Sequence, residues 1–242
     1  ANYQGGIATI PATANWILRK TGAASPALST TTPAAGSVYP NLTLENNTAT
    51  AWTTPLGSSF TGSVATATIK GNLDIGGSGT NTVSFLCSNT NANPVLVTGN
   101  ILIRAGNTLR NFGTGFEVQG NLTVTGSLIY DTNDSRRLVF SGGNAQSVSG
   151  AGTLNAWDCI LNKSGNSVTL NRVLTIDNQM TFTAGIMNTT AVNLLIFAST
   201  ATVAGANNAS FANGPVRYFG TAAFVFPVGK NSDYQPLAIG TY

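Results

Sequence analysis

A seven-residue phrase recurs along this chain and limits what the sequence can fold into more than any other feature. It reads IKGNLDI at 69–75, VTGNILI at 97–103 and VQGNLTV at 118–124. Each copy joins a Gly–Asn pair, typical of a bend, to apolar residues at alternate positions, which are typical of a half-buried strand. A fourth copy, IDNQMTF at 176–182, has Asn178 where the others have glycine. Because glycine and asparagine adopt the left-handed backbone conformation most readily, we expect that conformation at each bend.

The spacing of the copies predicts a β-solenoid. They begin at residues 69, 97, 118 and 176, and a Thr-x-Thr pattern recurs at 66/68, 123/125, 181/183 and 200/202. The copies are 28, 21 and 58 residues apart and the Thr-x-Thr pairs 57, 58 and 19, which fits an imperfect period of about 20 residues, the length of one solenoid turn. Turns of this kind stack about 4.8 Å apart and bury a continuous apolar column. Candidate turns begin near Val64, Val83, Val95, Phe116, Leu138, Leu154, Val173, Val192 and Val216. The predicted fold is all-β, a right-handed parallel β-helix, with the handedness taken from the usual crossover rule.

The N-terminal quarter of the chain differs from the rest. The repeat is absent before residue 61, and the segment 21–40 is rich in Pro, Ala, Ser and Thr. Solenoids need capped ends, since an open end exposes apolar edges and unpaired backbone. We therefore expect residues 1–60 to form an irregular N-terminal cap, with Trp16, Ile17 and Leu18 plugging the end, or else a docking segment. Residues 61–242 are expected to form the β-helix of about 20-residue turns, one structural unit overall.

The composition excludes several classes of function. Charged residues make up 8% of the chain, against about 25% in an ordinary soluble domain. The 11 basic residues are scattered, which disfavours a nucleic-acid partner. No apolar run is long enough to span a membrane. The absence of histidine removes most hydrolase triads and most zinc enzymes.

The two cysteines, Cys87 and Cys159, are separated in the sequence by three to four of the predicted turns. At about 4.8 Å per turn they would lie roughly 17 Å apart, whereas a disulfide needs Cα atoms within about 7 Å. We predict two free, largely buried thiols, with an intermolecular bridge as the alternative.

Residues that could carry chemistry are few and dispersed. The densest oxygen cluster, Asp131-Thr132-Asn133-Asp134 followed by Arg136-Arg137, does not match a calcium loop and is interpreted as a solvated turn. Sugar hydrolysis needs two carboxylates about 5–10 Å apart, and no such pair is evident among the eight acids. A groove holding two acids, or an acid with Arg104 or Arg110, would favour an enzyme. The eight acids are Glu45, Asp74, Glu117, Asp131, Asp134, Asp158, Asp177 and Asp233.

Two further patterns are compatible with a binding role and with a plain structural one. The Thr-x-Thr pairs suggest an ice-binding face, but the turns between them break the row, and threonine is a good strand residue in any case. A late group of aromatic residues could form a sugar-binding platform, although core packing is the commoner use of such residues. This group is Tyr218, Phe219, Phe224, Phe226 and Tyr234.

Three segments resemble those of a known group of proteins: the GNLTV phrases, TFTAGIMNT at 181–189 and FPVGKNSDYQPLAI at 226–239. They are similar to segments of secreted, β-helical repeat surface proteins of the Bacteroidota that are exported by the type IX route. The resemblance covers roughly residues 65–242. It implies an extracellular or cell-surface location and a surface role, and it supplies no catalytic residues.

The sequence thus predicts an extracellular structural protein, a self-assembling filament subunit that is not an enzyme. Its partners would be further copies of itself, joined head to tail through the N-terminal segment and the final turn, Val216 to Tyr242. No catalytic, cofactor-binding or metal-binding residue and no cofactor is predicted. Two alternatives stay open, a cell-surface adhesin that binds glycans and a polysaccharide-degrading enzyme.

Overall fold

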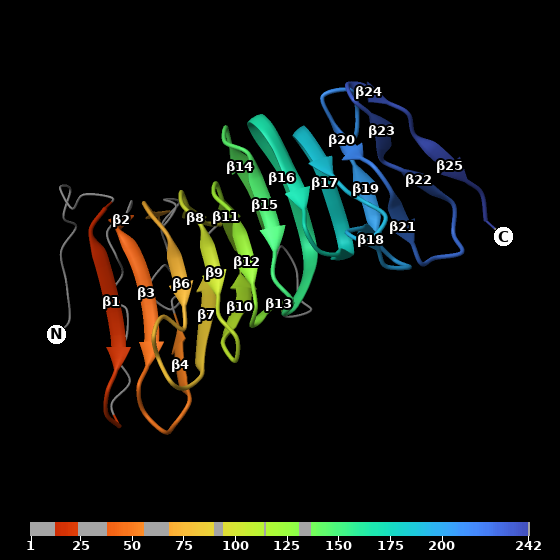
Figure 1. Ribbon diagram of the computed structural model, residues 1–242. Helices are drawn as coiled ribbons and strands as arrows, with labels where there is room; N and C mark the ends of the chain where they lie inside the picture. The colour runs from red at the N-terminus through yellow and green to blue at the C-terminus, as the bar shows by residue number, and fades with distance from the viewer. Residues whose placement is uncertain are drawn as a thin grey trace.

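The computed structural model describes residues 13–23, 38–55, 68–89, 94–113, 115–130 and 137–241. Within these ranges every regular element is a β-strand, and nearly all strands pair in parallel. The strands stack in rows along one axis, with β1 (Asn15–Lys20) at one end and β25 (Leu237–Ile239) at the other (Figure 1). The predicted all-β, parallel β-solenoid is confirmed.

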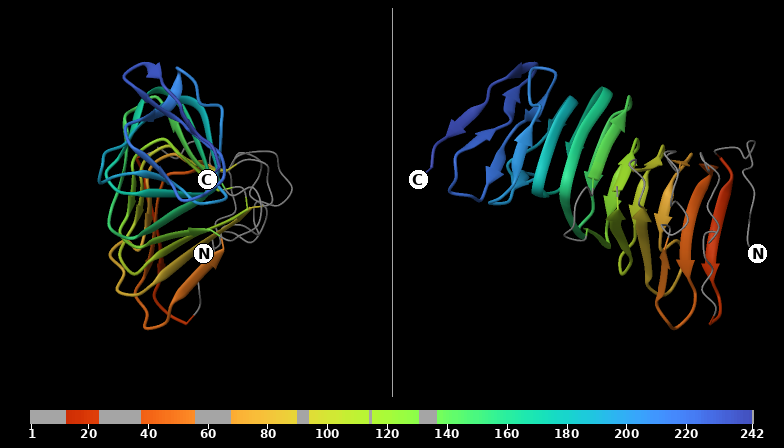
Figure 2. Two further views of the ribbon diagram at one scale, coloured as in Figure 1. Left: turned by 90° about the vertical axis from the view of Figure 1, so that its right-hand side faces the viewer. Right: turned by 180° about the vertical axis from the view of Figure 1, so that it is seen from behind.

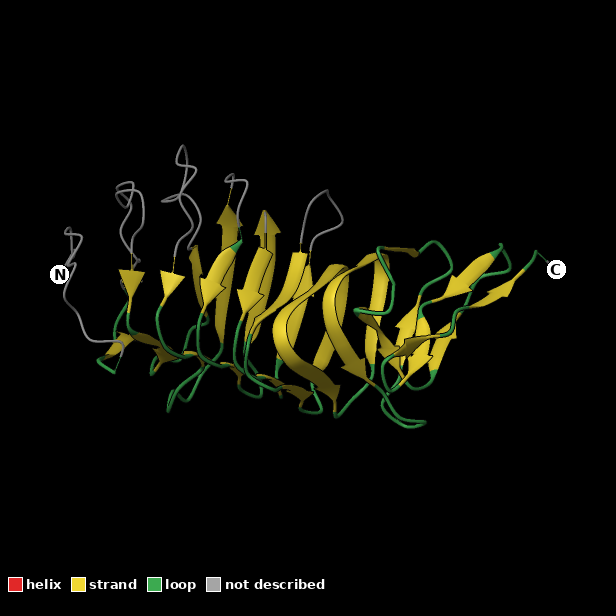
Figure 3. Ribbon diagram, turned by 90° about the horizontal axis from the view of Figure 1, so that it is seen from above, coloured by secondary structure: helices red, strands yellow, loops and turns green. Residues whose placement is uncertain are grey.

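Each turn of the solenoid contributes one strand to each of three faces, seen end-on in Figure 2 and from above in Figure 3. The first face consists of β2 (Val38–Tyr39), β5 (Thr68–Ile69), β8 (Val95–Val97), β11 (Gly115–Val118), β14 (Arg137–Gly142), the middle of β16 (Thr153–Leu170), the middle of β17 (Leu174–Asn188) and β19 (Thr202–Ala204). The second consists of β1 (Asn15–Lys20), β3 (Asn41–Asn46), β6 (Leu73–Ile75), β9 (Ile101–Ile103), β12 (Leu122–Val124), β15 (Gln146–Ser149), the ends of β16 and β17, β20 (Ser210–Asn213) and β23 (Val228–Lys230). The third consists of β4 (Trp52–Pro55), β7 (Val83–Asn89), β10 (Thr108–Gly113), β13 (Ser127–Tyr130), the starts of β16 and β17, β18 (Leu195–Phe197) and β21 (Val216–Tyr218).

The core is a set of columns in which each turn places an apolar residue above its counterpart in the turn before. On the first face one column runs through Ile69, Val97, Val118, Phe140, Leu161 and Phe182, and all are at most 1% exposed. On the second face the corresponding column is Leu42, Leu73, Ile101, Leu122, Val148 and Leu170, all fully buried. Since no single turn could bury these side chains, their burial depends on stacking.

The predicted turn starts do not all fall on the same face. Val95, Phe116 and Leu138 lie at or next to the start of first-face strands, as expected of successive turns. Leu154 lies instead at the start of β16, on the third face, and Val216 begins β21 on that face too. The alternation of apolar and polar residues is the same on every face, so it locates strands without showing where a turn begins. Val64 lies outside the described residues.

Solenoid strands also occur within the segment expected to be irregular. β1 pairs with β3 from Asn15↔Asn41 to Lys20↔Asn46, and β3 continues to β6. The solenoid therefore begins by residue 15 rather than near residue 61. In β1, Trp16 and Leu18 pack against the core as expected of a plug, but Ile17 is 53% exposed.

The Gly–Asn pairs of the repeated phrase form one corner of the solenoid, between the first and second faces. At this corner each asparagine side chain accepts a hydrogen bond from the backbone N–H of the next turn. Asn72 Oδ1 accepts from Asn100 N at 2.8 Å, and Asn100 Oδ1 accepts from Asn121 N at 2.7 Å. The ladder continues at both ends, to Asn41 Oδ1 and to Ser147 N. It supplies acceptors for N–H groups that the bend removes from the sheet.

The glycine of the phrase has a different role from the one expected. Neither Gly99 nor Gly120 has a positive φ. A Cβ on Gly120 would lie 2.5 Å from the carbonyl carbon and oxygen of Gly99, and a Cβ on Gly99 would lie 2.6 Å from Asn72 Oδ1. Glycine is needed there because successive turns touch. Asn178 of the fourth copy also lacks a positive φ, and it lies at another corner, between the third and first faces.

The C-terminal end departs from parallel stacking. β22 (Phe224–Phe226) pairs antiparallel with β25 (Leu237–Ile239), and β23 pairs antiparallel with β24 (Asp233–Tyr234). Residues 216–242 were expected to be a final turn of the same kind. Instead β24 covers the outer edge of β23, and the second face ends there.

Candidate functional site

Two acids on the second face, Glu45 and Asp74, are each paired with an arginine. Arg104 binds Asp74 through two guanidinium nitrogens, at 2.9 Å from Nε to Oδ1 and 2.8 Å from Nη2 to Oδ2. Glu45 is buried against Arg19 and accepts hydrogen bonds from the Ser78 N–H and hydroxyl. Burial by itself would raise the pKa of Glu45, but the Ser78 hydrogen bonds and Arg19 bring it below its ordinary value. These contacts favour a structural role for both acids.

Asp158 and Asp177 lie closer together than the sequence indicated. Asn178, which follows Asp177, donates to Asp158 Oδ1 at 2.7 Å from the neighbouring turn. Tyr130 OH donates to Asp177, and the Tyr130 ring lies 5.6 Å from that of Trp157. Each carboxylate therefore has a local donor. The signal for this neighbourhood was the separation of the two aspartates in the sequence, which matches one turn of the solenoid.

The remaining acids lie apart from these. Ser141 Oγ donates to Glu117 at 2.6 Å, while Lys163 Nζ donates to the Ser141 carbonyl at 2.8 Å. Asp233 is exposed in the terminal β23–β24 turn. The proposed solvated turn with Asp131 and Asp134 lies outside the described residues. Among the residues that the structure describes, no group of three or more acids and cysteines could hold a metal ion.

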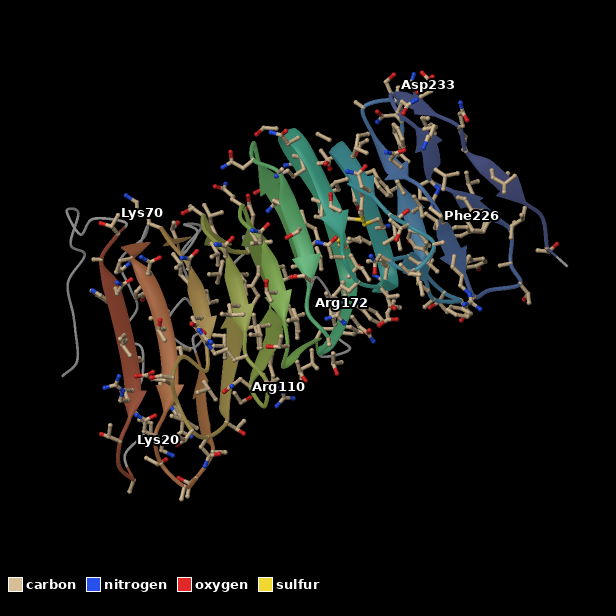
Figure 4. All side chains as sticks on the ribbon, viewed as in Figure 1. Lys20, Lys70, Arg110, Arg172, Phe226 and Asp233 are labelled. Atoms are coloured by element: carbon tan, nitrogen blue, oxygen red, sulfur yellow. The ribbon has the colours of Figure 1, made fainter. Side chains whose placement is uncertain are left out.

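The basic side chains form no continuous patch on the described surface. Lys20, Lys70, Arg110 and Arg172 are spread along the solenoid, as Figure 4 shows. Lys20 Nζ donates a hydrogen bond to Thr50 Oγ1, and Arg172 donates to the Gly152 carbonyl at 2.7 Å. The described part of the chain holds no helix that could span a bilayer.

Exposed large apolar side chains are few among the described residues, and three of the five lie near the C-terminal end of the solenoid. Five large hydrophobic residues are at least half exposed: Ile17, Val192, Phe219, Val225 and Leu237. Ile17 is on β1, the first described strand, and the last three lie on or beside the terminal strands β21, β22 and β25. Val192 precedes β18, one turn before the last parallel one. Contiguous apolar exposure is typical of a contact surface, whereas a single exposed residue such as Ile17 is also normal on a strand that faces solvent.

The C-terminal end also contains a cavity of about 720 Å³. It lies where parallel stacking stops: β19 pairs with β17 on one edge, while β22, which lies near its other edge, pairs with β25 instead. The lining consists of residues 199–206 and 222–225 with Tyr218 and Tyr234, none of which carries a charge. The volume is within the range of binding sites, about 300–1,000 Å³. We define this space as the β19 cavity.

The late aromatic residues belong partly to the core and partly to this cavity. Phe224 is buried against Phe197, at 5.3 Å between ring centroids, and Tyr218 stacks on it at 4.1 Å. Tyr218 OH donates to the Ser199 carbonyl at the cavity wall. Phe219 is 56% exposed beneath Arg217, whose guanidinium carbon lies 4.3 Å from the ring centroid. Most of the group packs as core residues, as expected, and Phe219 does not.

The prediction of two free, largely buried thiols can be compared with the structure for Cys159 alone. Cys159 is a free thiol at 0% exposure, in a core column between Leu138 and Met180. Burial raises the pKa of this thiol. Cys87 lies on β7, on a different face, and its side chain is outside the described residues.

No protein-family model, curated protein or solved structure matches the chain. The β19 cavity and the two ends of the solenoid are therefore the candidate functional site on their geometry alone. Sequence reasoning located the aromatic residues but missed the cavity. The signal for it was the Gly-Lys-Asn-Ser run at 229–232, typical of a hairpin turn, which ends the parallel stacking.

Proposed function

We propose that this protein is an extracellular structural subunit that assembles end to end into a filament. The observation that carries the proposal is the placement of exposed large hydrophobic residues: Ile17 at one end, and Phe219, Val225 and Leu237 at the other. A contact between two different ends of identical subunits is heterologous and grows into an open filament unless it closes into a ring.

The flanks of the solenoid support this role because they carry few charged groups. Their carboxylates are held in local pairs such as Arg104–Asp74, and the chain carries 8% charged residues. Low charge lets subunits approach without strong repulsion. The extracellular location rests on the resemblance to secreted β-helical surface proteins.

Negative-stain electron microscopy of the purified protein over a concentration series tests the proposal. The second face has ten strands from β1 to β23, which at about 4.8 Å per step predicts a subunit repeat of roughly 40–60 Å once the ends are included. Fibres with that repeat support the filament. Single rods at every concentration contradict it.

A glycan-binding adhesin is the second candidate, favoured by the β19 cavity. Tyrosine rings and hydroxyl groups line it together, and sugars are bound by such a combination of apolar faces and hydrogen-bonding groups. Binding on a glycan array that is lost on Tyr234→Ala would establish it. A third reading, a polysaccharide-degrading enzyme, would need turnover that depends on Asp158 or Asp177.

A further inference from the structure

The corner formed by the Gly–Asn pairs, here called the asparagine corner, carries a row of amide donors that the fold itself does not use. Oδ1 of Asn72, Asn100 and Asn121 accepts a backbone N–H of the following turn, so the Nδ2 group of each side chain points away from that turn. Among the described residues, none of these three Nδ2 groups has a hydrogen-bond acceptor. All three side chains are exposed. Because the turns repeat about every 4.8 Å, the donors form a row with that spacing.

A second polar column runs beside this row, on the other side of the glycines. It consists of Lys70, Thr98 and Gln119, each of which precedes the glycine of its phrase. Lys70 is exposed and lies at the edge where the second-face strands begin (Figure 4). Neither column contains an acid, and the nearest carboxylate in the phrases, Asp74, is held by Arg104. The corner therefore presents amide, hydroxyl and ammonium donors with no carboxylate among them.

This excess of donors favours a ligand whose groups only accept hydrogen bonds. An ionised carboxylate is such a group, whereas a hydroxyl group both donates and accepts. A hydrogen bond from an N–H group to a charged oxygen is also roughly twice as strong as one to a neutral oxygen. Lys70 adds a positive charge at the corner, and the whole chain has a net charge of +3. The chemistry thus fits an anionic ligand better than a neutral one.

The regular spacing of the row favours a polymer over a single small anion. One exposed amide that binds one carboxylate gains little in water, because the contact replaces hydrogen bonds to solvent. A chain with acidic groups at regular intervals meets several turns at once, and every contact after the first then forms at a high effective concentration. An extended polysaccharide advances by a distance per sugar similar to one solenoid turn, so its acidic groups can meet successive asparagines.

We propose that an extended anionic polysaccharide, with carboxylate or sulfate groups on its sugars, binds along the asparagine corner parallel to the solenoid axis. Asn72, Asn100 and Asn121 donate to its acidic groups, and Lys70 supplies a positive charge at one end of the row. The inference goes beyond the filament, whose contacts are at the two ends of the solenoid. It also uses a different surface from the β19 cavity, so a filament could carry this ligand along its flank.

The variant Asn100→Asp separates binding from folding. An aspartate at this position still accepts the Asn121 N–H and keeps the ladder intact, but it donates no hydrogen bond and repels an acidic ligand. The matched control is Asn155→Asp, which adds the same charge at an exposed asparagine on the third face. Equal melting temperatures of Asn100→Asp and the wild type would show that the ladder is kept. Lys70→Gln removes the positive charge from the corner without altering the asparagine row.

Isothermal titration calorimetry of the full chain, with EDTA in the buffer, measures binding of alginate oligomers of about two to eight sugars. The ladder from Asn41 to Ser147 takes four steps, about 19 Å, so we expect affinity to rise up to about four or five sugars and then level off. Asn100→Asp should weaken binding at least about tenfold, and Asn155→Asp less than about twofold. Lys70→Gln should weaken binding severalfold and reduce its dependence on salt.

Dextran sulfate and unmodified dextran identify the acidic group and the need for it. Binding of dextran sulfate in place of alginate would assign sulfate as the group that is recognised. No binding of either acidic polymer, or dextran bound as tightly as they are, overturns the proposal. Equal losses in Asn100→Asp and Asn155→Asp, or an affinity that does not depend on length, would show that the asparagine row is not the site. Because the filament is tested by microscopy of the protein alone, either proposal can fail without the other.

Discussion

Gly120→Ala tests how closely successive turns approach at the asparagine corner. The new Cβ would lie 2.5 Å from the carbonyl carbon and oxygen of Gly99 and 2.7 Å from Asn100 Oδ1. Overpacking against backbone costs about 1–3 kcal/mol. Separating the turns also strains two hydrogen bonds, Gly120 N to Gly99 O at 3.0 Å and Asn121 N to Asn100 Oδ1 at 2.7 Å, each worth about 1 kcal/mol. We expect the free energy of unfolding to fall by roughly 3–5 kcal/mol.

Equilibrium unfolding in guanidinium chloride, followed by tryptophan fluorescence, measures this loss. Gly143→Ala is the matched control, because Gly143 is exposed, has no positive φ and would bring its Cβ no closer than 3.5 Å to Ser164 Oγ. Its effect should stay below about 1 kcal/mol. Gly120→Asn separates the two roles of the glycine. Asparagine tolerates a left-handed bend but not the close approach, so it should cost at least as much as alanine. An effect of Gly120→Ala no larger than that of Gly143→Ala would refute the close-approach argument.

Three further predictions concern buried groups. Glu45→Gln should remove part of the loss of stability that the protein shows in acid. The pKa of Glu45 is lowered in the folded state, largely because the Ser78 hydrogen bonds outweigh the opposing effect of burial. The stability that this carboxylate contributes is therefore present above the unfolded pKa of 4.5 and is lost as the pH falls below it, which melting temperatures of both proteins from pH 7 to pH 3 test. Tyr130→Phe should flatten the fall in melting temperature over an alkaline series from about pH 8 to pH 12, because burial and the Asp177 contact raise the pKa of Tyr130 and its contribution is lost as the pH rises past about 10; an unchanged slope would contradict this. The Cys159 thiol should react with a thiol reagent only after denaturation, and rapid labelling of this residue in the native protein, located by mass spectrometry, would contradict its burial.

The repeated phrase predicted the solenoid because its physical basis is local. Alternating apolar residues after a bend make a strand with one buried face, and a period of about 20 residues places those faces above one another. The first-face strands at Val95, Phe116 and Leu138 were located in this way. The candidate starts at Val83, Leu154 and Val216 lie on third-face strands instead, since strands on all three faces share one alternation.

The N-terminal strands and the carboxylate neighbourhood were missed for a related reason. Trp16 and Leu18 lie on a solenoid strand because Leu42 and Leu44 of the next turn align with them, although the segment that joins the two strands lacks the repeated phrase. Asp158 and Asp177 are neighbours because one turn brings them to the same corner, where Asn178 joins them. Which strands pair across one turn depends on the partner strand, so neither segment alone carries a sequence pattern that predicts the pairing.

By itself the sequence determined that the chain stacks short strands into a weakly charged solenoid, since periodicity and composition are properties of each segment. Only the tertiary structure decided which residues face which neighbour, why Gly99 and Gly120 must lack a side chain, and where stacking stops. The stop depends on the antiparallel β22–β25 and β23–β24 pairs, which form between segments that the repeat would have continued in parallel. The β19 cavity lies between β19 and β22 because β22 pairs with β25 rather than with β19, a choice between pairing partners that is made in three dimensions.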